Sequence, residues 1–271
     1  MQIDVQGSAT YVYGGGRVPD AAAPAVLFLH GAQQDHSCWA LQSRYLAHHG
    51  YCVLAPDLPG HNRSQGRPLQ SIPDIAAWAV QLLDRLGIAR AALVGHSMGS
   101  LAALEIAARY PERASALALL GSSPLMPVSD VLREAMTGDP PRAMRMINLW
   151  SHARGLLGGN SAPGMWMLGA NLRLMQRGAA SNLAADLAAC HDYDGSAAAS
   201  LVRCATLVVM GARDQMTPPR AGRELAQRIA GAHSVVLDGA GHAMMAEQPD
   251  RVLDALKSFL ATALAPRPAA A

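Results

Sequence analysis

The sequence contains few cysteines, and they are widely spaced. None of the four forms a metal-binding or disulfide-framework pattern, so we expect buried, reduced thiols that act as small hydrophobic side chains. The sequence as a whole implies no metal or organic cofactor. The cysteines are Cys38, Cys52, Cys190 and Cys204.

Long apolar runs and clustered charge are also missing. The longest apolar stretches, such as AAAPAVLFLH at 21–30, are too short to cross a bilayer. The first residues, MQIDVQGSATY, lack the cationic and apolar parts of a secretory signal. The net charge is only +2 and no basic block occurs, which argues against a nucleic-acid partner. We therefore expect a cytoplasmic protein without a membrane span, and the sequence gives no indication of its oligomeric state.

The chain is long and apolar enough for one large domain with an insertion. Its 271 residues are 51% hydrophobic. Short apolar runs alternate with amphipathic segments, which predicts a mainly parallel, doubly wound sheet covered by helices on both faces. Strands are expected at 2–13 (two short ones), 25–30, 51–57, 89–96, 116–122, 206–211 and 233–239. Helices are expected at 37–49, 73–86, 98–109, 218–230 (with Thr217 as N-cap) and 249–264.

The segment 124–203 departs from this alternation. It contains no convincing strand and is broken into short helices, although it separates two strands. We therefore predict an α/β core at 1–123 and 204–271 and an inserted helical cap at 124–203. Seven methionines, together with Leu149, Trp150, Trp166 and Leu168, predict that the cap covers an apolar pocket, with most of its arginines on the outer face.

A serine lies where a predicted strand turns into a predicted helix. The stretch LVGHSMGSLAALEIA (93–107) places Ser97 between Gly95 and Gly99, and the glycines leave room for a tight turn. This is the pattern of the nucleophile elbow, G-x-S-x-G. A serine hydroxyl needs a base to take its proton and an acid to orient that base. Where this elbow occurs, the acid and then the histidine follow the serine along the chain.

Two downstream residues fit those roles. Asp214 follows the strand at 206–211, and His242 follows the strand at 233–239, so both should lie with Ser97 at the carboxyl edge of the sheet. Asp238 is a competing acid, but it is only four residues before the histidine. His96, adjacent to the serine, is expected to pack in the core rather than act as base.

These motifs together resemble the α/β-hydrolase superfamily, in its capped serine-hydrolase branch. The resemblance rests on HGA, APDLPGH, GHSMG, GARDQMTP and GAGHAMMAEQP and covers 25–122 and 204–262. It implies Ser97 as nucleophile, His242 as general base and Asp214 as orienting acid. It also implies an oxyanion hole formed by the backbone N–H groups of Ala32 and Met98.

The sequence departs from the family pattern in two loops. Asn62 stands where the family usually has glycine; because asparagine tolerates positive φ, the turn can be retained. The loop HGAQQDHSCW also lacks the HGxGPG form of carbon–carbon-bond hydrolases and the HGGPG form of proline iminopeptidases. The expected activity is therefore hydrolysis of a small, apolar carboxylic ester through an acyl-serine intermediate.

Several alternatives remain open at this stage. A carbon–carbon-bond hydrolase of aromatic ring-cleavage products uses the same triad, and a thioesterase, lactonase or acyltransferase is also compatible with it. The alternative from another class is a ligand receptor on the same fold. A receptor needs neither a base nor an orienting acid, so the complete triad argues against it.

Overall fold

The computed structural model describes residues 1–153 and 166–265. Eight strands form a single sheet in the order β1-β2-β4-β3-β5-β6-β7-β8. The first two strands pair antiparallel and β2 pairs antiparallel with β4, whereas the remaining pairs are parallel. The strands are β1 (Gln2–Val5), β2 (Ser8–Tyr13), β3 (Ala25–Leu29), β4 (Cys52–Pro56), β5 (Ala91–His96), β6 (Ala114–Leu120), β7 (Thr206–Gly211) and β8 (His233–Leu237).

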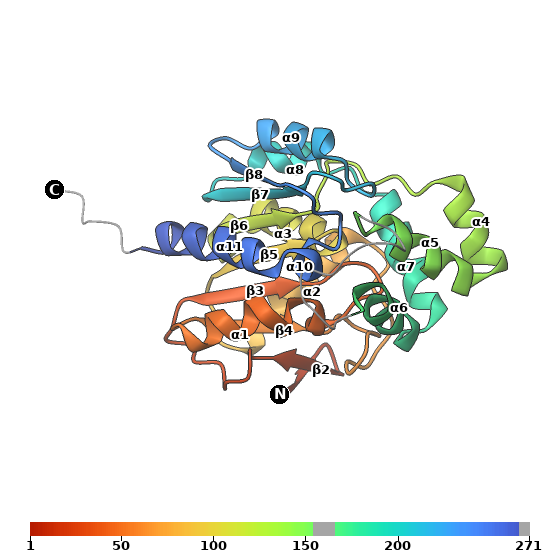
Figure 1. The fold of residues 1–271 in the computed structure, drawn as a ribbon. Helices are drawn as coiled ribbons and strands as arrows, with labels where there is room; N and C mark the ends of the chain where they lie inside the picture. The colour runs from red at the N-terminus through yellow and green to blue at the C-terminus, as the bar shows by residue number, and fades with distance from the viewer. Residues whose placement is uncertain (154–165, 266–271) are drawn as a thin grey trace.

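Helices cover both faces of this sheet, as the alternating sequence predicts (Figure 1). One face carries α1 (Ala40–His48) and α11 (Pro249–Ala263), and the other carries α2 (Ile72–Arg85), α3 (Met98–Arg109) and α9 (Pro219–Arg228). Residues of β3 alternate between the two faces: Leu27 and Leu29 join one core, while Val26 and Phe28 join the other. Every residue of β3 to β7 except one is buried, because these strands are covered on both sides.

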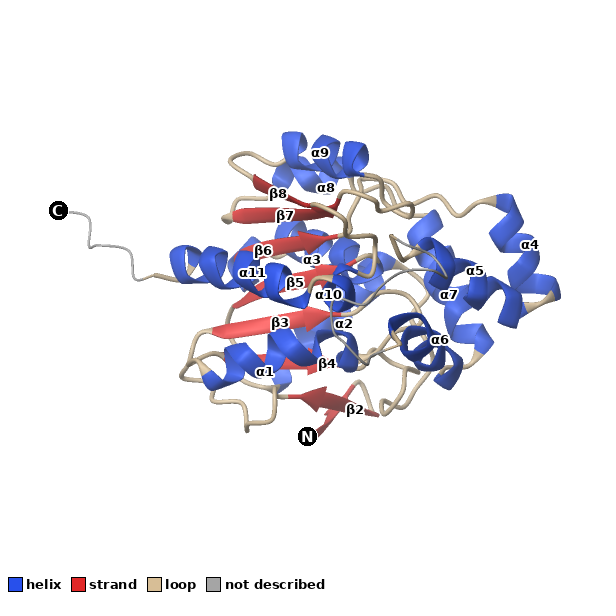
Figure 2. Cartoon of the chain, in the orientation of Figure 1, coloured by secondary structure: helices blue, strands red, loops and turns tan. Residues whose placement is uncertain are grey.

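The segment between β6 and β7 contains five described helices, of which the first four lie beyond the carboxyl ends of the parallel strands (Figure 2). They are α4 (Asp130–Gly138), α5 (Pro140–Trp150), α6 (Met167–Arg177), α7 (Ala180–His191) and α8 (Ser196–Leu201). The last of these packs against α3 and α9, beside the sheet, rather than with α4 to α6. The shorter helices are η1 (His36–Trp39), η2 (Pro111–Arg113) and α10 (Met244–Glu247).

The structure differs from one sequence expectation about these elements and agrees with another. The helix predicted to start at Pro218 with Thr217 as N-cap starts at Pro219 instead, so Thr217 was the wrong cap. Six of the seven arginines at 124–203 lie in the described part of the chain and are exposed, as expected for most of them: Arg133, Arg142, Arg145, Arg173, Arg177 and Arg203. The seventh, Arg154, lies outside the described residues. Across the described residues, every helix is too short or too polar to cross a bilayer.

Candidate active site

Ser97 occupies a strained turn between β5 and α3. Its backbone has φ 52° and ψ −122°, torsions that a residue with a Cβ rarely adopts and that cost about 1–3 kcal/mol. The turn is compact because its flanking glycines touch backbone. A Cβ on Gly95 would lie 2.2 Å from the carbonyl oxygen of Gly99, and one on Gly99 would lie 2.2 Å from that of Leu29. This geometry supports the predicted nucleophile elbow.

His242 and Asp214 form a buried pair at the ends of β8 and β7. His242 Nδ1 lies 2.8 Å from Asp214 Oδ2. Asp214 also accepts hydrogen bonds from the Met216 and Thr217 N–H groups and from the Thr217 hydroxyl. The Thr217 side chain therefore orients the acid, which explains why it does not cap a helix. Burial opposes ionisation of Asp214, but the His242 ring and these donors outweigh it and lower the pKa of the carboxyl below its ordinary value.

The same carboxyl edge brings Ser97 and His242 to one cavity. Both residues line it, together with Thr217. Ser97 Oγ and His242 Nε2 are not hydrogen-bonded to each other in the described structure. Hydrogen bonds between catalytic groups commonly tighten only when a substrate binds. Because Nδ1 faces Asp214, the proton is expected on Nδ1, which leaves Nε2 free to accept one.

Of the two competing residues, His96 lines the same cavity, whereas Asp238 does not. His96 is buried, and its Nε2 lies 2.9 Å from the His242 carbonyl oxygen, to which it donates. Its Nδ1 is buried without a partner among the described residues. Burial and the neighbouring His242 lower the pKa of His96 to about 3, so this ring is neutral and serves packing. Asp238 is exposed, and its backbone carbonyl accepts a hydrogen bond from the Gln248 side-chain amide.

The two predicted oxyanion donors lie beside the serine. Met98 is the first residue of α3, where backbone N–H groups have no partner within the helix. Ala32 lines the cavity. The preceding residue, Gly31, is close to the serine, because a Cβ placed on Gly31 would lie 3.2 Å from the Ser97 Cβ. Neither N–H has a hydrogen-bond acceptor among the described residues. Both are thus free to donate to a substrate oxygen.

The cavity has a volume of about 210 Å³ and is lined mainly by apolar side chains, as the composition of the cap predicts. Of the four cap residues expected to contribute, only Trp150 is among the residues that line it; Leu149, Trp166 and Leu168 are not, and Trp166 is 76% exposed. No lysine, arginine, aspartate or glutamate lines it within the described part of the chain. The apolar lining consists of Ala32, Met126, Pro127, Val128, Leu132, Ile147, Trp150, Met175, Leu187, Cys190 and Met216.

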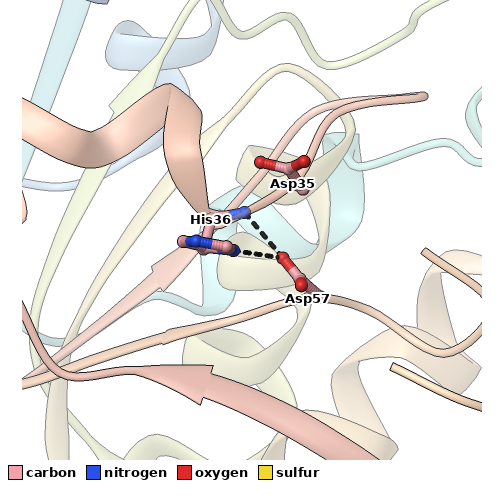
Figure 3. Close-up of side chains that lie close together, drawn as sticks. All are labelled: Asp35, His36 and Asp57. Carbon is pink, nitrogen blue, oxygen red and sulfur yellow. Dashed lines mark hydrogen bonds and ion pairs between the residues drawn. The ribbon is translucent and has the colours of Figure 1, made fainter. Parts of the chain in front are cut away.

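A cluster of Asp35, His36 and Asp57 brings together groups that could in principle bind a metal (Figure 3). Protein donors already occupy these carboxylates. Asp57 accepts from the backbone N–H and Nδ1 of His36 and from two donors in the 60–64 turn. Asp35 accepts from the N–H and hydroxyl of Ser37 and thereby caps η1. We therefore assign the cluster to loop structure.

The turn that departs from the family pattern is retained. Asn62 adopts φ 41°, which confirms the expectation that asparagine would accept a positive φ there. Two residues near this turn and near Ala32 were not predicted from the sequence. They are Gln33 and Asp186. Both are buried and polar. The only local signal for Asp186 was a charge on an otherwise alanine-rich helix, one turn after Asn182.

Comparison with known proteins gives consistent results. A model described as the alpha/beta hydrolase family matches residues 26–255. The chain is 32% identical over 223 residues to a 2-hydroxymuconate semialdehyde hydrolase of Pseudomonas putida, covering 78% of this chain and 77% of that protein. Its fold is similar to that of the enol-lactonase from Burkholderia xenovorans LB400, with a TM-score of 0.84 and 26% identity over 96% of this chain and 99% of that one. An esterase from Exiguobacterium antarcticum has a similar fold at 20% identity, with a TM-score of 0.83 and coverage of 96% and 98%.

Proposed function

The chain belongs to the alpha/beta hydrolase family, and from that premise we propose that it is a serine hydrolase that cleaves carboxylic esters with an apolar acyl or alcohol group. The observation that carries the proposal is the strained turn of Ser97 at the same apolar cavity as the buried His242–Asp214 pair. In this proposal, 1–123 and 204–271 form the catalytic core, and 124–203 is the inserted segment whose helices α4 to α7 cap that cavity.

In the proposed reaction, Ser97 Oγ attacks the carbonyl carbon while His242 Nε2 takes the hydroxyl proton. The Ala32 and Met98 N–H groups receive the negative charge that develops on the carbonyl oxygen. The bond to the alcohol oxygen then breaks, and His242 returns its proton to that oxygen. Water repeats the sequence on the acyl-serine, which releases the carboxylic acid and regenerates the serine.

The absence of charged side chains from the described lining of the cavity favours a neutral, apolar ester. A substrate carboxylate in such a pocket would lose its hydration without gaining a cationic partner. The second candidate is carbon–carbon-bond hydrolysis of a ring-cleavage dienoate. It is favoured by the relative from Pseudomonas putida, whose name describes a semialdehyde hydrolase.

Replacing the serine tests the proposal. Ser97→Ala should lower kcat for a p-nitrophenyl ester by up to about 10⁶-fold. It should also abolish covalent labelling by a fluorophosphonate probe. Ser258→Ala, on the exposed face of α11, is the matched control and should behave as wild type. Turnover above about a tenth of wild type in Ser97→Ala would refute the assignment.

A substrate panel separates the two candidates. p-Nitrophenyl esters and a ring-cleavage dienoate are compared by kcat/KM on the same preparation. Higher kcat/KM for the esters supports the proposal. A dienoate that exceeds every ester would establish the second candidate and refute the first.

A further inference from the structure

The loop that carries Ala32 is bonded to the cap rather than to the core alone. The Gln33 N–H donates to Asp186 Oδ2 on α7 over 2.8 Å. The Gln33 side-chain amide donates to the carbonyl oxygens of Met175 and Ala179, at 2.9 and 3.2 Å. Gly178 makes room for this amide, since a Cβ there would lie 2.8 Å from Gln33 Nε2. Residues at the end of α6 and on α7 therefore bind this loop through hydrogen bonds.

Helix α7 also binds the neighbouring 60–62 turn. Asp186 Oδ2 lies 3.0 Å from His61 Nε2, and both side chains are buried. One turn earlier on the same face, Asn182 Nδ2 donates to the carbonyl oxygen of Gly60 over 2.6 Å. A single face of one cap helix thus joins the Ala32 loop to a second loop of the core.

The hydrogen-bond partners define the charge of the two histidines beneath this helix. Both nitrogens of His61 face acceptors, Asp186 Oδ2 and the Pro59 carbonyl, which only the cationic ring satisfies. Burial opposes that charge, but Asp186 and the carbonyl outweigh it and raise the pKa of His61 above its ordinary value. Burial and the nearby His61 lower the pKa of His30 to about 4, so His30 is neutral.

His30 extends the network to the peptide that contains the Ala32 N–H. Its Nε2 accepts from the Leu58 N–H, so its proton is on Nδ1, which donates to the Gly31 carbonyl over 2.9 Å. That carbonyl and the Ala32 N–H belong to one peptide group. The next peptide is fixed by the bond from Gln33 to Asp186. Hydrogen bonds on both sides therefore determine the direction of the Ala32 N–H.

We propose that Asp186 is a positioning residue of the oxyanion hole: together with Gln33 and His61, it aligns the Ala32 N–H only when α7 is docked on the core. Docking of the cap and stabilisation of the oxyanion are then one event. This inference rests on the proposed function, because it assumes that an oxyanion forms beside Ser97. The backbone of Gln33 supports this inference. Its φ of 57° is a strained torsion, and the hydrogen bonds of Gln33 to the cap maintain it.

Three variants separate alignment from folding. Asp186→Ala removes the acceptor, whereas Asp186→Asn can place an amide oxygen near the same position and should restore part of the activity. Gln33→Gly suits the positive φ and keeps the N–H. It removes only the side-chain bonds to carbonyls that retain Gly178 and Asn182 as donors, so it should fold even if Asp186→Ala does not. Asp192→Asn, exposed just after α7, is the matched control.

The assay measures kcat and KM for p-nitrophenyl butyrate and inhibition by a trifluoromethyl ketone, whose adduct with serine bears an oxyanion. In Asp186→Ala and Gln33→Gly, we expect kcat to fall about 10- to 100-fold with KM nearly unchanged. Inhibition should weaken by a similar factor. Asp192→Asn should match wild type.

The inference is overturned if folded Asp186→Ala or Gln33→Gly keeps wild-type kcat, or if kcat falls while ketone inhibition does not. If Asp186→Ala does not fold, folded Asp186→Asn decides the role of Asp186, because Gln33→Gly keeps the N–H that donates to Asp186; wild-type kcat in Asp186→Asn would then overturn the inference. Failure of the proposed function gives a different result, because Ser97 would then not be labelled by fluorophosphonate even in the wild-type protein.

Discussion

Replacing Asp214 with asparagine should stop the proposed reaction by holding His242 in the wrong tautomer. Asp214 Oδ1 accepts from two fixed backbone donors, the Met216 and Thr217 N–H groups, at 2.8 and 2.9 Å. The asparagine must therefore place its oxygen there. Its amide nitrogen then replaces Oδ2, 2.8 Å from His242 Nδ1, and can only donate to it. His242 consequently carries its proton on Nε2 and cannot accept one from Ser97.

The expected loss is about 10⁴-fold in kcat, equivalent to about 5.5 kcal/mol of transition-state stabilisation. The assay is the hydrolysis of p-nitrophenyl butyrate, with thermal unfolding to verify that the variant is folded. Asp238→Asn is the matched control, because it removes one carboxylate at an exposed position of the same region and should retain wild-type kcat.

Two results would contradict this tautomer argument. One is an Asp214→Asn variant that keeps more than about a tenth of the wild-type kcat. The other is an equal loss in Asp238→Asn, which would assign the orienting role to the competing acid.

Three further predictions concern the pocket, the turn and pH. Across p-nitrophenyl esters from acetate to octanoate, each added methylene should raise kcat/KM by up to about fourfold until the cavity is full, and a flat or falling series would exclude an apolar acyl site. Gly99→Ala should lower the free energy of unfolding by more than about 2 kcal/mol in denaturant titrations, because its Cβ would clash with the Leu29 carbonyl; an unchanged midpoint would disprove this. Since the pKa of Asp214 is lowered, its ionised form stabilises the fold above about pH 4, and this contribution disappears as pH falls through the lowered pKa. Stability measured from pH 7 to 3 should thus fall less steeply in Asp214→Asn than in wild type.

The sequence was most informative where local pattern and local structure coincide. The helix predicted at 98–109 and the strand predicted at 206–211 have those limits in the structure. Ser97 could be placed because Gly95, Gly99 and the change from strand to helix all lie within a few residues. Asp214 and His242 followed from their positions after strands, since parallel strands bring their carboxyl ends to one edge.

Contacts between distant segments gave no comparable signal. Asp186 is 125 residues from His61 and 153 from Gln33, so no spacing rule relates them. The prediction that Thr217 caps the helix was wrong. A threonine before two prolines is typical of a helix start, and this pattern does not show whether the hydroxyl bonds to another residue. Only the three-dimensional structure showed that the Thr217 hydroxyl donates a hydrogen bond to Asp214. The extent of the cavity depends likewise on how cap helices pack.

The order of strands has a consequence for the protein as it is being synthesised. His242 follows β8, which is the last strand of the described residues and lies at one edge of the sheet, against β7. Ser97 is translated about 145 residues earlier, at a rate of roughly 5–20 residues per second. Under the proposed mechanism, a ribosome-bound chain therefore exposes a serine that has no base, and it cannot hydrolyse esters until its final strand has docked.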